Sequence, residues 1–274
     1  MFEKYLQSVR QKAPLIHNIT NYVTANDCAN MLLAAGASPI MADAPEEAAE
    51  ITANCQGLNL NMGTLSQSRL TAMLAAGRKA SEMKHPIILD PVGIGASQFR
   101  KNAAAQLLSQ LWVSIVRGNI SEIKMLAQGS GAAKGVDADE ADGADEESIQ
   151  TRIRLAKQSA QQLGAVIVAT GTVDVVTDGV VVYCIENGHP LMRKVTGAGC
   201  QLSALTAAFA AAEPDNLTEA AAAAVCAMGV CGEIAFERMK PEDGNASYRN
   251  YVIDAMYHLQ PENLKKRGRY QTIK

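Results

Sequence analysis

The sequence predicts an α/β fold with a mainly parallel central sheet and helices on both of its faces. Up to residue 170, short and nearly continuous apolar runs alternate with longer segments of helical spacing, a pattern typical of parallel strands buried on both faces. Asp178-Gly179 lies between β-branched runs and predicts a small hairpin near one edge of the sheet. The chain after this hairpin has a helical pattern.

The apolar runs define the strands, because each is short and ends at turn residues. We expect strands at 37–41, 58–62, 86–90, 112–116 and 165–170. The intervening segments and the C-terminal part predict helices. These are expected at 22–35, 45–54, 66–82, 100–110, 120–127, 148–163, 200–212, 217–238 and 247–259. Alternation of this kind implies right-handed crossovers between parallel strands.

The chain shows no internal repeat and no linker, so we expect one domain over residues 1–274. Segment 127–148 is rich in Gly, Ala and acidic residues and predicts a surface loop. The strand–helix pattern continues after it with the same character, which argues against a domain boundary there.

Composition excludes several classes of function. The formal net charge is −3, so no basic excess exists to bind nucleic acid or an anionic membrane. The six cysteines form no CxxC pair, which favours a reducing, cytoplasmic compartment. The N-terminus lacks an apolar signal region, and we expect no membrane span.

The segment "VTGAGC" (195–200) precedes an alanine-rich, nearly uncharged helix. Thr196, Gly197, Ala198 and Gly199 can direct successive backbone N–H groups toward one point, and a helix end adds its free amides and positive dipole. An ordinary tight turn is the alternative. The helix is nearly uncharged and is therefore expected to be buried, yet it begins with polar residues. This combination favours an anion site with Cys200 at its edge. No GxxxxGK[ST] motif is present, so the chain is not a P-loop protein.

Acidic residues follow two predicted strands. Asp90 ends the predicted strand "PIILD", and Glu122 follows "RGNIS", which contains Arg117 and Asn119. Each residue alone could cap a helix or form a turn. Together, the two carboxylates at neighbouring strand ends suit Mg²⁺, which prefers oxygen ligands and phosphate.

Three positions near the N-terminus could bind a neutral ligand or simply support the fold. Asn21 could hydrogen-bond a ligand or cap a turn. Met41 could pack in the core or contact an aromatic ring. Gly63, in "NMGTL", allows the backbone to approach another group closely.

Seven segments, in order, resemble the hydroxyethylthiazole kinase family of the ribokinase-like superfamily. They are "HNITN", "GASPIMA", "NMGTL", "ILDPVG", "RGNISEI", "ATG" and "KVTGAGC". The resemblance spans nearly the whole chain and implies a ribokinase-like fold. It also implies transfer of the ATP γ-phosphoryl group to the hydroxyl of 4-methyl-5-(2-hydroxyethyl)thiazole, for thiamine biosynthesis or salvage, in a homotrimer with sites at subunit interfaces.

The resemblance also implies roles for individual residues. Asp90 and Glu122 would serve Mg²⁺, Arg117 and Thr170 would contact ATP, and Thr196 to Gly199 would form the anion hole. The residues expected around the thiazole are Asn21, Val23, Met41, Gly63, Thr64 and Gly197.

Related kinases carry Asp, the general base, where this chain has Cys200. The thiol could be a thiolate base whose pKa the helix end lowers, a neutral group that positions the hydroxyl, or a covalent nucleophile. Other activities of the superfamily also stay open: an ATP-dependent NAD(P)H-hydrate dehydratase, a hydroxymethylpyrimidine kinase, or a thiazole-binding protein with weak catalysis.

Overall fold

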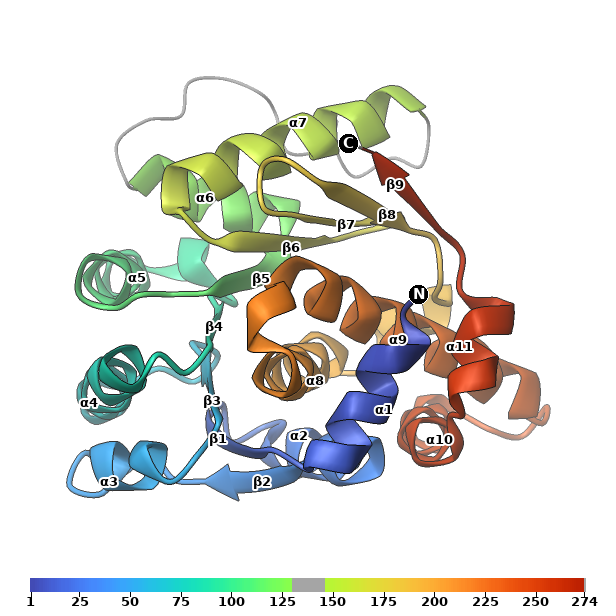
Figure 1. Ribbon diagram of the computed structural model, residues 1–274, viewed down its shortest axis with the longest axis horizontal. Coiled ribbons are helices and arrows are strands. Elements are labelled where there is room, and N and C mark those ends of the chain that lie inside the picture. The colour runs from blue at the N-terminus through green and yellow to red at the C-terminus, as the bar shows by residue number, and fades with distance from the viewer. Residues whose placement is uncertain (130–145, 274) are drawn as a thin grey trace.

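A computed structural model describes residues 1–129 and 146–273 (Figure 1). Within these residues, nine strands form one sheet in the order β2-β1-β3-β4-β5-β6-β7-β8-β9. The strands are β1 (Leu15–Ile19), β2 (Ser38–Met41), β3 (Gly57–Asn61), β4 (Ile87–Asp90), β5 (Ile115–Asn119), β6 (Val166–Thr170), β7 (Asp174–Thr177), β8 (Val182–Ile185) and β9 (Tyr270–Ile273). Pairing is parallel from β2 to β6 and antiparallel from β6 to β9. The predicted fold class and the hairpin are confirmed.

Helices cover both faces of the sheet, with a separate apolar core on each side (Figure 1). One face carries α1 (Glu3–Lys12), α2 (Ala25–Ala35), α8 (Ala198–Ala212), α9 (Leu217–Arg238) and α10 (Asn245–His258), with α11 (Pro261–Arg267) beside α1. The other face carries α3 (Ala48–Ala53), α4 (Gln67–Met83), α5 (Gln98–Gln110), α6 (Ile120–Gly129) and α7 (Glu146–Leu163). The short helices are η1 (Ile94–Ala96), η3 (Pro190–Lys194) and η4 (Pro214–Asn216).

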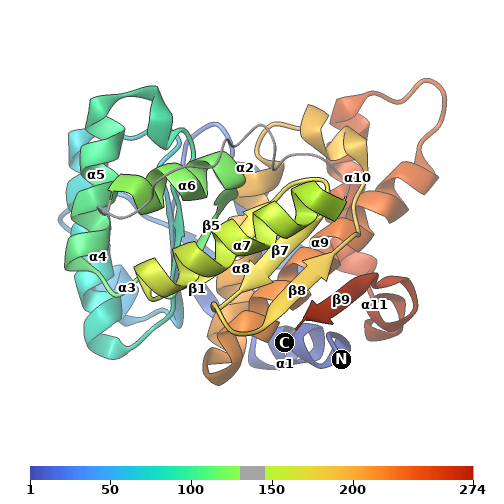
Figure 2. The same cartoon turned by 90° about the horizontal axis from the view of Figure 1, so that it is seen from above.

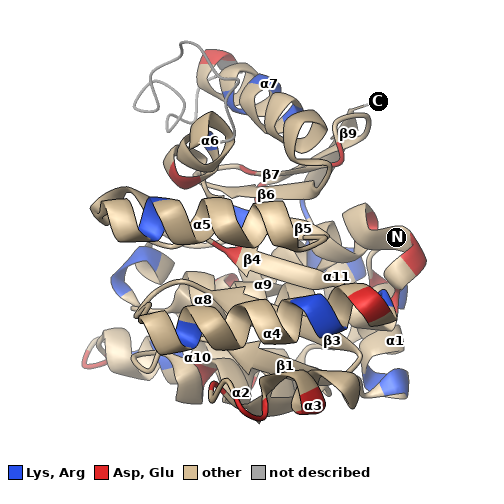
Figure 3. Ribbon diagram, turned by 90° about the vertical axis from the view of Figure 1, so that its left-hand side faces the viewer, with Lys and Arg blue, Asp and Glu red and all other residues tan. Residues whose placement is uncertain are grey.

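Helices α8 and α9 lie in the interior. Figure 3 shows charged residues on outer helices such as α4 and α5, whereas α8 carries none. Among the described residues, one helical segment, Pro214–Arg238, is long and apolar enough to cross a membrane. However, 78% of its apolar window is buried inside the fold. This segment therefore forms a buried core helix of the fold.

The main difference from the predicted elements is β1, which no apolar run indicated. This strand reads "LIHNI", and its polar residues His17 and Asn18 are buried. The ring nitrogens of His17 lie 2.8 Å from Thr52 Oγ1 and 2.8 Å from the Ala42 carbonyl, and burial lowers the pKa of this histidine. Tertiary hydrogen bonds thus stabilise a polar strand that periodicity cannot detect.

Other boundaries also differ. Strand β5 begins and ends later than the predicted 112–116, because its pairing with β6 continues as far as Asn119 and Thr170. Helix α8 begins at Ala198, two residues before its predicted start. The terminal elements α1, α11 and β9 were not predicted. They lie side by side in Figure 2. The ring centroids of Phe2 and Tyr270 lie 4.3 Å apart.

The carboxyl ends of the parallel strands meet at one edge of the sheet. Strand β1 lies between β2 and β3, so the strand order reverses there. Ligands of open α/β sheets bind outside the strand ends at such a reversal. The register places Asn61 opposite Asp90 and Asn119 opposite Thr170. Asp90 and Thr170, two of the predicted site residues, thus lie at this edge.

Candidate active site

The segment "VTGAGC" contains the start of α8. Residues from distant parts of the chain lie so close to its two glycines that neither position has room for a side chain. Gly197 is the N-cap residue with φ 82°, a left-handed conformation that favours glycine. A Cβ atom at Gly197 would overlap Thr24, and one at Gly199 would overlap the Arg117 guanidinium. The glycines therefore let α2 and β5 approach the helix end closely.

The start of α8 provides backbone donors for an anion. The Gln201 N–H group donates to the Gly197 carbonyl at 2.9 Å and closes the first turn. The preceding amides of Gly199 and Cys200 have no carbonyl one turn earlier in the helix to bind. These amides and the positive helix end favour a phosphate group.

A buried chain of hydrogen bonds lies directly beside this helix end. The Asn21 amide donates to Cys200 Sγ at 3.2 Å and to Asn61 Oδ1 at 3.0 Å. The Asn61 amide donates to Asp90 Oδ2 at 2.8 Å, and the Ser203 hydroxyl donates to the same oxygen at 2.7 Å. We call Asn21, Asn61, Asp90, Cys200 and Ser203 the buried polar network. It links the loop after β1 with β3, β4 and α8.

The two predicted metal carboxylates differ in their surroundings. Asp90 is fully buried, and its Oδ1 atom has no hydrogen-bond partner among the described residues. Glu122 accepts the N–H groups of Gly93 and Asn119 at 3.0 Å each, while the Asn119 side chain accepts the Glu122 N–H group at 2.9 Å. Glu122 therefore caps α6 and holds the turn after β4, and Asp90 has the free oxygen.

The Cys200 thiol is buried among these groups. Its burial, and to a lesser extent the negative Asp90, raise the pKa of this thiol above the ordinary value of 9.0. Hydrogen bonds from Thr24, Asn21 and Asn61 oppose the rise without reversing it. Burial thus counts against the first of the three readings, a thiolate base whose pKa the helix end lowers, and favours a protonated thiol.

A cavity of 670 Å³ opens on the other side of the α8 start. Its wall includes Arg117, Thr170, Asp174, Gly197 and Gly199. Apolar side chains of Met192, Val225 and Met228 also line it. This size and mixture of polar and apolar groups suit a small-molecule ligand.

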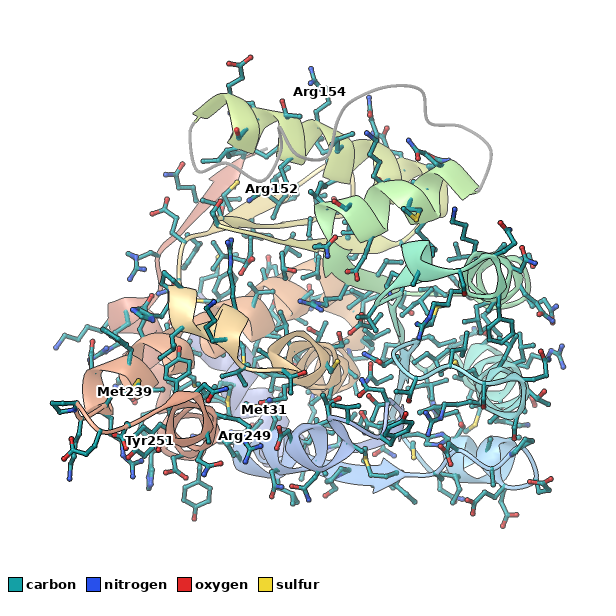
Figure 4. All side chains as sticks on the ribbon, turned by 180° about the vertical axis from the view of Figure 1, so that it is seen from behind. Met31, Arg152, Arg154, Met239, Arg249 and Tyr251 are labelled. Carbon is teal, nitrogen blue, oxygen red and sulfur yellow. The ribbon has the colours of Figure 1, made fainter. Side chains whose placement is uncertain are left out.

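Arginine side chains form part of this wall. Arg117 donates to the Thr170 hydroxyl at 3.0 Å, and its guanidinium lies 3.7 Å from Asp90, so it connects the cavity with the buried polar network. On α7, Arg152 points into the protein and Arg154 points outward (Figure 4). Arg152 donates to the Val173 carbonyl and packs under Gly171, which lines the cavity.

Asp174, like Glu186, brings a carboxyl group to the wall of this cavity. It accepts the Gly171 N–H group at 2.9 Å. Burial raises the pKa of Asp174 to about 6, although Gly171, Arg117, Arg152 and Arg193 each act to lower it. This residue therefore titrates close to neutral pH.

The remaining predicted residues lie around the same sheet edge. Gly63 packs against Asn21, since a Cβ atom there would lie 2.7 Å from the Asn21 side chain. Thr64 accepts the Tyr22 N–H group at 3.4 Å. Val23 and Met41 are 58% and 39% exposed, and Thr196 is also exposed. These three do not belong to the buried polar network.

Sequence reasoning missed Asn61, Ser203 and Asp174. A signal existed for Asn61, because Asn59 and Asn61 alternate with leucines in "LNLNM" and so share one face of β3. Ser203 lies three residues after Cys200, on a neighbouring part of the same helix surface. The predicted 127–148 loop falls largely on residues 130–145, outside the described residues.

Comparisons with known proteins agree with this arrangement. The model of the hydroxyethylthiazole kinase family matches residues 6–262. A hydroxyethylthiazole kinase of Clostridium acetobutylicum is 51% identical over 272 residues, covering 99% of this chain and 100% of that protein. The chain belongs to this family. Membership makes it a kinase, and the resemblance found in its motifs is confirmed.

Solved structures extend the comparison to the fold. The hydroxyethylthiazole kinase of Pyrococcus horikoshii OT3 superposes with a TM-score of 0.89 at 32% identity, covering 100% of this chain and 99% of that one. A ribokinase-like superfamily protein of Enterococcus faecalis V583 reaches a TM-score of 0.61 at 13% identity, covering 93% and 89%. The second likeness concerns the fold alone, which is ribokinase-like.

Proposed function

We propose that the protein transfers the γ-phosphoryl group of ATP to the hydroxyl of 4-methyl-5-(2-hydroxyethyl)thiazole, a step of thiamine biosynthesis or salvage. The observation that carries the proposal is the position of the α8 start between the 670 Å³ cavity and the buried polar network. ATP would occupy the cavity, the thiazole alcohol would lie beside Asn21 and Gly63, and the two would meet at Gly199 and Cys200.

The chain's own groups would bind and orient the reacting atoms. The bond between the γ-phosphorus and the β,γ-bridging oxygen breaks, and a bond from the thiazole hydroxyl oxygen to phosphorus forms. The Gly199 and Cys200 amides would stabilise negative charge on the transferred group. Arg117 and Thr170 would hold the phosphates of ATP, which leaves as ADP.

In this proposal Cys200 acts as a neutral thiol that orients the hydroxyl, with Asn21 fixing the sulfur atom. Phosphoryl transfer usually has a loose transition state in which the nucleophile forms little bonding. Its hydroxyl proton can then leave late, to a phosphoryl oxygen or to solvent. A charged base at position 200 is therefore not essential, although it would help.

A divalent metal fits the residues present. Asp90 offers a buried oxygen that has no hydrogen-bond partner among the described residues. Glu122 accepts the N–H group of Gly93, which belongs to the turn that follows Asp90. The described residues contain no cluster of three or more His, Cys, Asp or Glu residues for a metal. Such a sparse carboxylate set suits Mg²⁺, which keeps waters and shares its coordination with phosphates. When bound, Mg²⁺ would neutralise phosphate charge.

The proposal extends to assembly, domain organisation and location. Tyr22, Val23 and Met41 are 74%, 58% and 39% exposed at the sheet edge. Another copy of the chain could cover these apolar groups and complete the thiazole site, as expected for a homotrimer. Residues 1–274 would work as one domain in the cytoplasm, which agrees with six free cysteines.

One assay tests the proposed reaction. ADP release is measured in parallel reactions with the thiazole alcohol, with a hydroxymethylpyrimidine and with hydrated NADH. A fourth reaction without any of these substrates is the control. We expect release that depends on the thiazole and a phosphorylated thiazole as product. ADP release only with the pyrimidine, product formation only from hydrated NADH, or thiazole binding without turnover would each contradict the proposal.

A further inference from the structure

The loop after β3 has an unusual set of hydrogen bonds. The carbonyl oxygens of its three residues, Met62, Gly63 and Thr64, all accept from guanidinium groups. Arg100 on α5 donates to the first two, and Arg69 on α4 donates to the third at 2.9 Å. Both arginines reach the loop from the helices that cover the α3–α7 face, and neither belongs to the proposed substrate-binding residues.

Arg100 also reaches the turn after β4. Its Nη1 atom donates to the Val92 carbonyl at 3.0 Å as well as to Met62. The residue after Val92 is Gly93, whose N–H group donates to Glu122. One guanidinium therefore connects the loop after β3 with the turn that Glu122 holds.

A displacement of this loop would be transmitted to Cys200 and Asp90 through two contacts of Gly63. The Gly63 N–H group donates to Asn61 Oδ1 at 2.9 Å, and Gly63 packs directly on the Asn21 side chain. Asn21 and Asn61 hold Cys200 and Asp90. Movement of Gly63 thus changes the wall of the thiazole site and the hydrogen bonds that orient Cys200.

We infer that Arg100 is a positioning residue that sets the distance between the thiazole-binding loop 62–64 and the Asp90–Gly93 turn. The inference rests on the proposed function. This positioning needs the forked guanidinium group of an arginine. Its two terminal nitrogen atoms lie in one fixed plane and donate to three carbonyl oxygens. A lysine keeps the charge but has one nitrogen, and it cannot hold both segments in the same way.

The experiment compares Arg100→Lys with Lys101→Ala, an exposed neighbour on α5. We expect Arg100→Lys to raise KM for the thiazole alcohol and lower kcat, with a combined loss of about 10- to 100-fold in kcat/KM, the scale of a misplacement near 1 Å. The dissociation constant of ADP should not change, because Arg100 does not line the nucleotide cavity. Lys101→Ala should behave as the wild type.

A second variant separates positioning from stability. Arg100→Ala removes the fork, and added guanidinium ion at millimolar concentration should restore part of its kcat while the melting temperature stays constant. Unchanged thiazole KM and kcat in Arg100→Lys would overturn the inference. So would a loss of melting temperature without a KM change, or absence of rescue in folded Arg100→Ala. An inactive wild type would instead refute the proposed function, so the two failures are distinguishable.

Discussion

The buried polar network and the nucleotide cavity share the start of α8 but are built differently. The network consists of packed side chains from β3, β4, the loop after β1 and α8, and they hydrogen-bond one another. The cavity lies toward the antiparallel part of the sheet, and five of its lining residues are glycines. One region thus orients groups, and the other accommodates a charged ligand.

The largest expected effect comes from Asp90→Asn in the network. The amide keeps the shape but loses the charge, so we expect kcat to fall by at least about 100-fold, since electrostatic stabilisation is commonly the largest catalytic contribution. The free energy of unfolding should change little, because the amide oxygen still accepts from Asn61 and Ser203, and the removed cost of burying a charge offsets the lost ion pair with Arg117. Steady-state kinetics and thermal melting check both parts.

The exposed Asp215→Asn is the matched control for this substitution and should change neither quantity. Asp90→Asn with nearly normal kcat would mean that the network only supports the fold.

Gly199→Ala tests the cavity side and should have the next largest effect. The added methyl group overlaps the end of the Arg117 side chain, which can move without unfolding the chain. We expect about a 100-fold loss of kcat/KM and weaker ADP binding, with a nearly unchanged melting temperature. Calorimetric titration of ADP measures this, and Gly244→Ala, where no atom lies within 4 Å, is the control. Normal ADP binding in Gly199→Ala would contradict the assigned role of Arg117.

Substitutions of Cys200 should have smaller effects, because the thiol in this account only orients the hydroxyl. Cys200→Ala should lower kcat by about 10-fold, which is less than the loss of a general base typically costs. Cys200→Asp should retain or raise kcat, since a carboxylate adds a base. Single-turnover rates with saturating ATP measure both variants. Equal rates in all three proteins would exclude a role for position 200.

The smallest effect concerns pH and the cavity. Because the pKa of Asp174 is raised to about 6, its negative charge appears beside the nucleotide as pH rises through this value. We expect ADP affinity of the wild type, relative to Asp174→Asn, to weaken a few-fold between pH 5 and about 7. Parallel ADP titrations across this range give the ratio. A constant ratio would show that Asp174 does not face the nucleotide.

The same contrast explains what the sequence could predict. The anion site was visible because Gly197 and Gly199 stand in one short segment before an uncharged helix. Asp90 and Arg117 were found at predicted strand ends, since parallel strands bring their carboxyl ends to one edge, whereas Thr170 was suggested by the family resemblance. Local patterns therefore predicted part of the cavity wall and most of the sheet.

The network was less predictable because its hydrogen bonds join residues far apart in the chain. Asn61 and Ser203 both donate to Asp90, across 29 and 113 residues. Strand β1 escaped prediction for a related reason, since His17 is stabilised by partners outside its own strand. The raised pKa of Cys200 also depends on burial and on Asp90, which lies far away in the sequence, so a local pattern does not show it.

The central claim is that Cys200 works as a protonated thiol between two regions that supply orientation and charge stabilisation. The most direct test is the ratio of kcat between the wild type and Cys200→Ala, measured from pH 6.5 to 8.5 with saturating substrates. Because burial raises the thiol pKa above 9.0, the account predicts a constant ratio over this range. A ratio that rises about tenfold per pH unit would show a thiolate base and contradict the account.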